Sequence, residues 1–225
     1  MAKLTEEEWN ASNDSYPMLR PCRRIIRYHP RKGHLFAVAC CLRIWHLFAD
    51  ERSREAVAIL DRYIEGLATE AQLRAAEKAA QAAHTDAFQV KGKVGASAEW
   101  AAQFAASSDG WQAASRASNF AYVAAGDGLQ PGPEHTAQAH LLRCIFGPLP
   151  FRSVEIEPSW LIWNDGTIQK IARTIYEERA FDHLPVLADA LEDAGCANAH
   201  ILGHCRGAGP HVRGCWVVDL MLGKE

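Results

Sequence analysis

The residues from His34 to Phe48 form a continuous apolar stretch with the sequence HLFAVACCLRIWHLF. On a helical wheel its apolar side chains cover almost every face, with Arg43 and His46 as a polar edge. A helix that is apolar nearly all round must be covered by other elements. The stretch is also shorter than the roughly 18 residues that a membrane-spanning helix needs. It therefore predicts a central, buried helix in a globular protein that does not enter a membrane.

Helix-start signals surround this stretch and predict an all-α fold. Thr5 and Glu8 have the spacing of a capping box, and so do Thr69 and Gln72. Asp50 is placed to cap a helix that carries apolar residues at helical spacing. We expect an irregular array of about eight helices, all-α or nearly so, with a glycine-rich loop near the C-terminus.

The remaining chain divides into further predicted helices and connectors. Residues 84–128 are rich in alanine and predict two helices that split near Ser107–Gly110. Prolines predict irregular backbone or a short helix over 21–33, and a loop or short extended stretch over 151–163. Further helices are expected over 134–146, 167–179, 184–194 and 200–205, and the tail 215–222 fits a helix or a strand.

The domain organisation predicted from this pattern is a single helical domain over 1–225. The turn-rich segment 126–133 is the one place where the chain could divide, into 1–128 and 134–225.

The charge distribution is uneven along the chain. The formal net charge is −3, yet residues 15–49 contain no Asp or Glu. A positive segment of this kind can bind an anionic partner such as a nucleic acid, or it can pack against the acidic remainder of the chain. The candidate nucleic-acid contacts are Arg20, Arg23, Arg24, Arg27, Arg31 and Lys32.

Cysteine usage and the N-terminus indicate the compartment. The chain has seven cysteines, an odd number, and lacks a C-x2-C pair. Such a pattern favours free, mostly buried thiols over a disulfide framework. The first ten residues, MAKLTEEEWN, lack the basic start and apolar stretch of a secretory signal. We therefore expect a cytoplasmic protein.

Four nitrogen and sulfur donors gather near the C-terminus in a candidate metal site. His204, Cys205, His211 and Cys215 lie within twelve residues and flank a glycine-rich loop. Four such donors can complete the tetrahedral shell of Zn²⁺. The alternative is that these side chains cap the loop and fill the core, because the spacing is not that of a common zinc module. Cys144 is expected to be a core or cap residue.

The same loop offers a candidate anion site. Arg206 and Arg213 supply positive charge, and Gly207 and Gly209 allow the backbone to approach a phosphate closely. The loop is neither a P-loop nor a dinucleotide-binding fingerprint. The alternative is a tight turn whose arginines pair with acids of the preceding helix. Those acids are Asp189, Glu192 and Asp193.

The chain also resembles a family of planctomycete proteins. The resemblance rests on Thr5–Trp9 with Pro17–Arg20, on the run LFAVACCLRIWHLFADERSREAV, and on the segment from Tyr176 to Glu225. The part PVLADALEDAGC is similar to the LADWLEERGD-type motif of the repeat-companion domain. The resemblance implies a compact module and carries no activity, cofactor or catalytic residue.

The function predicted from these observations is a helical protein–protein interaction module in a bacterial regulatory or defence system, with a protein partner. Standard hydrolase motifs are absent from the sequence. The alternatives are an enzyme or sensor that uses the candidate metal or anion site, and nucleic-acid binding through the basic segment.

Overall fold

The computed structural model describes residues 4–127 and 131–224, and every regular element in these ranges is a helix. The all-α prediction is therefore confirmed. The described residues form thirteen α-helices, several of them short, and three single-turn 3₁₀-helices. Within the described residues, no helix combines the length and the apolar character that crossing a bilayer demands.

The chain divides into two compact units, Met1–Leu142 and Arg143–Glu225. We call them unit 1 and unit 2. The division falls inside helix α8 (Pro133–Phe146). It lies later than the connector at 126–133 that the sequence offers, part of which is outside the described residues.

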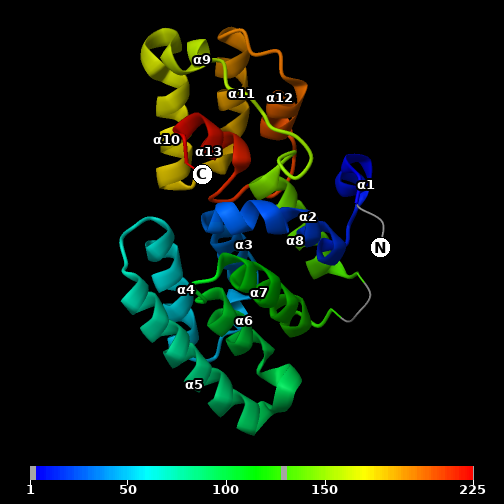
Figure 1. Cartoon of the computed structure of the whole chain (residues 1–225), viewed down its shortest axis with the longest axis vertical. Coiled ribbons are helices and arrows are strands. Elements are labelled where there is room, and N and C mark those ends of the chain that lie inside the picture. The colour runs from blue at the N-terminus through cyan, green and yellow to red at the C-terminus, as the bar shows by residue number, and fades with distance from the viewer. Residues whose placement is uncertain (1–3, 128–130, 225) are drawn as a thin grey trace. The chain divides into compact units, whose positions relative to one another are not determined.

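Figure 1 labels the helices, which begin and end as follows. Before α8, the helices of unit 1 are α1 (Glu6–Ala11), α2 (Ser15–Tyr28), α3 (Pro30–Arg43), η1 (Trp45–Leu47), α4 (Glu51–Ile64), α5 (Glu70–Gly95), α6 (Ser97–Ala105) and α7 (Gly110–Ala124). After α8, unit 2 contains α9 (Pro158–Ile162), η2 (Trp163–Gly166), α10 (Thr167–Glu178), η3 (Phe181–His183), α11 (Leu184–Asp193), α12 (Ala199–Arg206) and α13 (Trp216–Leu222).

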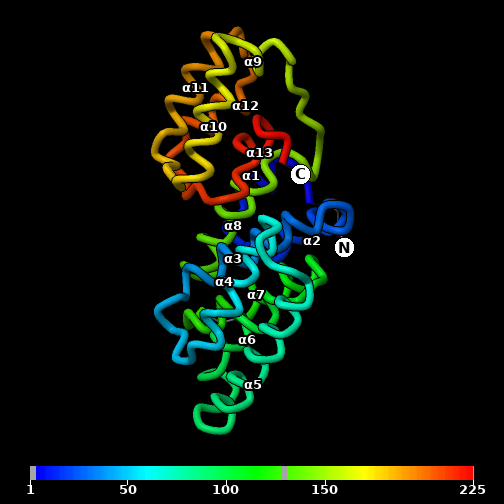
Figure 2. The backbone as a smooth tube through the Cα atoms, turned by 90° about the vertical axis from the view of Figure 1, so that its left-hand side faces the viewer, coloured from blue at the N-terminus to red at the C-terminus, as the bar shows by residue number. Residues whose placement is uncertain are grey.

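Helix α3 is the buried centre of unit 1, as its apolar sequence predicts. Every residue from Lys32 to Cys41 is buried, and the helix packs against α2, α4, α6 and α7. Figure 2 shows α3 among these neighbours within the unit. The helix ends at Arg43, and η1 continues the chain to Phe48. Arg43 leaves the apolar face and donates from Nε to both carboxylate oxygens of Glu134, at 3.0 and 2.9 Å.

Residues 21–33 take the helical one of the two predicted alternatives, as parts of two longer helices. Helix α2 runs through Pro21 without a break, and α3 begins at Pro30. Asp14 starts α2 by accepting a hydrogen bond from the backbone N–H of Tyr16. A proline inside a helix removes one backbone hydrogen bond. Burial of the apolar face of α2, which includes Met18, Cys22 and Ile26, offsets that loss.

The cap signals in the sequence mark helix starts correctly. Thr5 with Glu8 and Thr69 with Gln72 form reciprocal capping boxes, and Asp50 caps α4. The alanine-rich segment splits where expected, with α6 ending at Ala105 and α7 beginning at Gly110. Helix α5 continues to Gly95, into the segment 84–128 that the sequence assigns to two further helices, and contains a kink at Gly92 with a φ of 71°.

Unit 2 has its own apolar core, built from α10, α11, α12 and α13. The fully buried side chains include Ile168, Ile175, Leu187, Leu191 and Val217. The tail of the chain, which fits a strand or a helix by pattern, forms helix α13.

A close approach of two backbones joins α3 to α7 in unit 1. A Cβ placed on Gly33 would lie 2.3 Å from the carbonyl oxygen of Gly110, and one on Gly110 would lie 2.6 Å from that of Pro30. Both distances are far below van der Waals contact, so this crossing requires glycine on each helix. Beside it, His34 Nε2 lies 3.0 Å from the carbonyl oxygen of Ser107.

Gly33→Ala should lower the free energy of unfolding of unit 1 by about 1–3 kcal/mol, because the added methyl group must push α3 away from α7. Urea unfolding of the full chain followed by circular dichroism measures this loss. The control is Gly203→Ala on α12, where a Cβ meets no atom within 4 Å. That change should be neutral or stabilise by up to about 1 kcal/mol. Equal losses in both variants would contradict the close-approach argument.

Candidate metal centre

The end of α8 positions Cys144 in unit 2. The helix stops at Phe146 because Gly147 adopts a positive φ of 51° and Pro148 follows it. A Cβ on Gly147 would lie 2.6 Å from the indole ring of Trp216. The missing side chain therefore lets the end of α8 press against the residue that follows Cys215 in the sequence.

The segment between α12 and α13 brings three more donors to the same place. His204 lies in the last turn of α12, which Gly207 terminates. His211 Nε2 lies 3.3 Å from the carbonyl oxygen of Gly207, so the loop folds back on the end of α12. A turn closed by the backbone N–H of Cys215 and the carbonyl of Val212, at 2.9 Å, then leads into α13.

Together these elements form a cluster of two cysteines and two histidines: Cys144, His204, His211 and Cys215. One ligand atom from each side chain lies within 4.8 Å of all the others. Cys144 Sγ is 3.8 Å from His211 Nδ1, and Cys215 Sγ is 3.2 Å from His204 Nε2. In a tetrahedral zinc site, bonds of about 2.3 Å to sulfur and about 2.0 Å to nitrogen place S and N about 3.5 Å apart. The observed spacings lie on either side of that value.

The electrostatics of the cluster favour a thiolate at Cys215. Burial acts to raise the pKa of the Cys215 thiol, but hydrogen bonds from Cys144, His204 and His211 hold that pKa well below its usual value. Burial raises the pKa of Cys144 well above its usual value, and its hydrogen bond to Cys215 adds to this. Burial acts to lower the pKa of His211, but contact with Cys215 raises it overall. The thiol of Cys144 and the ring of His211 therefore lie beside one anionic sulfur, and a metal cation can take the place of the protons that they hold against it.

Contacts around the cluster orient its ligands. When His211 carries its proton on Nε2, that nitrogen donates to the carbonyl of Gly207 and leaves Nδ1 facing Cys144. Metal-binding histidines commonly hold their second ring nitrogen in this way, which fixes the tautomer and the ring orientation. Cys144 and Cys215 are 2% and 0% exposed, whereas the two histidines are half-buried.

The structure changes the predicted ligand set at one position. His204, His211 and Cys215 come together as the sequence suggests, but Cys205 does not join them and lies buried in the core of unit 2. Successive residues of an α-helix point about 100° apart, so His204 and Cys205 aim in different directions. Cys144, which the sequence assigns to the core, supplies the fourth donor. It lies far upstream of the others, so no local spacing reveals it.

The candidate anion loop has its positive charges engaged within unit 2. Arg206 contacts Asp189 at 2.7 Å and Glu192 at 2.6 Å, which is the alternative that the sequence leaves open. The guanidinium of Arg213 lies 5.3 Å from the centre of the Tyr176 ring. Gly207 ends α12, and Gly209 is exposed. The loop therefore serves the Cys/His cluster and the packing of unit 2.

The basic segment divides into an exposed part and a buried part. Arg20, Arg23, Arg24 and Arg27 are exposed on α2. Arg31 is half-buried, and Lys32 is 5% exposed at the start of α3. Lys32 is therefore wrongly included among the predicted nucleic-acid contacts.

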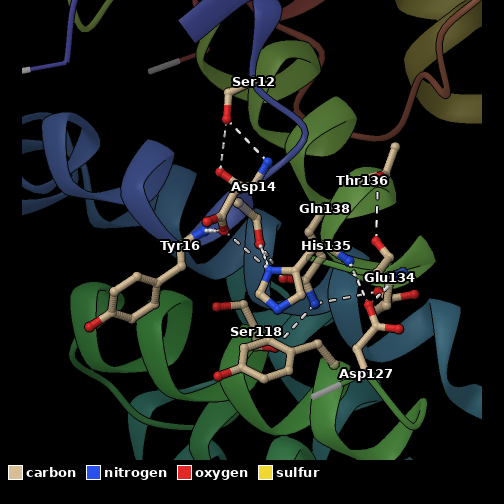
Figure 3. A network of polar contacts seen from close by, with 12 residues as sticks. Ser12, Asp14, Tyr16, Ser118, Asp127, Glu134, His135, Thr136 and Gln138 are labelled. Atoms are coloured by element: carbon tan, nitrogen blue, oxygen red, sulfur yellow. Dashed lines mark hydrogen bonds and ion pairs between the residues drawn. The ribbon is translucent and has the colours of Figure 1, made fainter. Parts of the chain in front are cut away.

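A second polar cluster, in unit 1, was not predicted from the sequence. Ser15 Oγ contacts His135 Nδ1 at 3.3 Å and Gln138 Oε1 at 3.1 Å, and Asp14 Oδ1 lies 3.4 Å from the same histidine nitrogen. Figure 3 shows His135 and Gln138 of α8 facing Asp14 at the start of α2. Asp127 fixes the start of α8 by accepting from the backbone N–H groups of Glu134 and His135.

This cluster contains Ser, His and Asp but lacks the geometry of a catalytic triad. A triad uses one histidine nitrogen for the serine and the other for the carboxylate. Here both partners contact Nδ1 of His135, and its buried Nε2 has no partner among the described residues. The cluster therefore ties α8 to α2, and Ser15 is not an activated nucleophile.

No family model, no curated protein and no solved structure matches the chain.

The ligand set seen in the structure predicts opposite zinc contents for alanine variants of two buried cysteines. Cys144→Ala should remove the bound zinc, whereas Cys205→Ala should retain one equivalent, because only Cys144 faces the other three donors. Native mass spectrometry with elemental analysis, on protein purified without a histidine tag, measures the zinc content. Both variants lose the same sulfur from a buried site, so the pair is matched. Zinc loss on Cys205→Ala alone would restore the ligand set predicted from the sequence.

Proposed function

We propose that this chain is a zinc-binding helical protein in which a structural Zn²⁺ stabilises unit 2. The observation that carries the proposal is the convergence of Cys144, His204, His211 and Cys215, with donor atoms within 4.8 Å of one another. Two sulfur and two nitrogen donors are the ligands that zinc takes in structural sites. Hard cations such as Mg²⁺ and Ca²⁺ prefer oxygen and do not fit this donor set.

A structural role fits better than a catalytic one. Catalytic zinc sites keep one position open for water or substrate, whereas four protein ligands fill the tetrahedral shell. The size of unit 2 supports the same reading. It spans Arg143–Glu225, close to the roughly 70–80 residues below which a single apolar core gives little stability. An ion that joins α8, α12 and the start of α13 would supply the missing stabilisation.

The proposal also places the protein in the cytoplasm. All seven cysteines are free and buried. Free thiols and thiolate metal sites suit a reducing compartment, which supports the cytoplasm. A protein partner and a place in a regulatory or defence system stay predictions from the sequence.

Removal of zinc should loosen unit 2 and leave unit 1 intact. Chelation should increase amide hydrogen exchange in α12 and α13 by at least about tenfold, because the ion links these helices to α8. Exchange in α3 and α7 should stay unchanged, which makes these helices the internal control. Hydrogen exchange with mass spectrometry, on the full chain with and without chelator, measures both. Unchanged exchange in unit 2, or a protein purified without metal, would overturn the proposal.

A further inference from the structure

One face of helix α2 in unit 1 carries a row of arginines. Arg20, Arg23, Arg24 and Arg27 follow the spacing i, i+3, i+4 and i+7, and all four are exposed. We call this set the arginine face. At a rise of about 1.5 Å per residue it extends about 10 Å along the helix axis. Residues of the opposite face, including Met18, Cys22 and Ile26, are buried in the unit.

The arginine face lines a groove of about 880 Å³. Two aromatic side chains, Tyr28 and Trp111, line the same groove, and the guanidinium of Arg23 lies 5.4 Å from the centre of the Trp111 ring. Asp109 is the one acidic residue among the described lining. Its carboxylate accepts hydrogen bonds from the backbone N–H groups of Trp111 and Gln112, at 2.8 and 2.9 Å.

Positive charge in this groove therefore exceeds negative charge. Within the described residues, neither Arg24 nor Arg27 forms an ion pair. By contrast, the exposed Arg74 on α5 pairs with Glu70 at 2.6 Å. Guanidinium groups bind phosphate through charge-assisted and often bidentate hydrogen bonds. A row of them next to aromatic rings suits a ligand with repeated phosphates and flat groups.

A smaller pocket of about 300 Å³ adjoins the groove and shares Arg20 and Trp111 with it. The other lining residues that matter here are Ser115, Ser118, Asn119 and Tyr122 of α7, with Tyr16 and Gln138. Figure 3 shows Tyr16, Ser118 and Gln138 at the polar cluster described above. This volume is at the lower end of the roughly 300–1,000 Å³ found for small-ligand sites. Gln138 and the hydroxyls of α7 are already hydrogen-bonded within the unit, so the groups offered to a ligand are the exposed Tyr16 ring and the half-buried Asn119 amide. Aromatic rings and amides bind a nucleobase by its faces and edges.

We propose that unit 1 binds single-stranded nucleic acid, with phosphates along the arginine face and a base in the adjoining pocket. The pocket favours a single strand over a duplex. A paired base would have to leave its stack to enter the pocket, which costs unstacking and unpairing free energy. The pocket also favours a nucleic acid over an acidic peptide, because the carboxylates of such a peptide would contact the arginines but not the aromatic and amide groups. This role is separate from the zinc site and does not depend on it.

The first test is binding of a fluorescent 12-nucleotide single strand, as RNA and as DNA, measured by anisotropy over a range of salt concentrations. Four phosphate contacts should give a slope of log affinity against log salt of about −2.8. Arg24→Gln with Arg27→Gln should weaken binding at least about tenfold at low salt and reduce the slope by about 1.4. Both side chains are exposed, and circular dichroism checks that α2 remains helical.

The matched control removes the same charge elsewhere in unit 1. Arg62→Gln with Arg74→Gln changes two exposed arginines outside the groove, and it should leave affinity within about twofold. Tyr16→Ala tests the pocket and should weaken binding about tenfold with an unchanged salt slope, because stacking does not release counterions. Tyr16 is 69% exposed, so its removal leaves the core intact.

Each outcome decides the proposal. Binding of the RNA strand, the DNA strand or both supports it and identifies the nucleic acid. Equal binding of the wild-type protein to polyglutamate of matched charge, to a duplex or to anionic vesicles would overturn it, since the surface would then be a general polyanion binder. Absence of binding at low salt, or equal losses in the control and the groove variants, would overturn it as well.

Discussion

Close approach between helices is the constraint on which unit 1 depends. The buried centre α3 can be covered tightly only if its neighbours carry small side chains at the contacts. Ala101, Ala102 and Ala105 of α6 and Ala113, Ala114 and Ala117 of α7 are all fully buried. Gly33 and Gly110 complete the contact where the two backbones meet. Alanine loses no side-chain entropy on burial, so many short contacts can hold these helices together. The same packing turns the apolar face of α2 inward and its arginines outward.

Aromatic rings supply the large buried area that the small alanine side chains cannot provide. Trp100 stacks on His84 at 4.4 Å and on Phe120 at 4.2 Å, and Phe104 stacks on Phe120 at 5.6 Å. These rings come from α5, α6 and α7, and each buries far more area than an alanine does. The alanine-rich segment is therefore a packed arrangement of helices. The alanine-rich composition of this segment, taken alone, fits a mobile arm equally well.

The sequence predicts features that depend on neighbours along the chain. Helix starts at Thr5, Asp50 and Thr69 follow from side chains that cap their own helix, and α3 follows from its continuous apolar character. The sequence left helix or irregular backbone open around Pro21, because the energy that holds Pro21 in a helix comes from burial against other helices. Three of the four clustered metal donors were found because they lie close together in sequence. Cys144 was missed because Gly147 and Trp216, from opposite ends of unit 2, bring it to the site.

The position of Cys144 has a topological consequence. With the proposed ion in place, the chain from Cys144 to His204 becomes a closed loop that contains α9, α10 and α11. A metal that closes a long loop restricts the unfolded chain more than one that closes a short loop. The stretch 152–157 within this loop is irregular and largely exposed, which is where a protease would cut. A chain cut there would stay in one piece, because the ion would hold the two fragments together as a disulfide holds the two chains of a nicked protein.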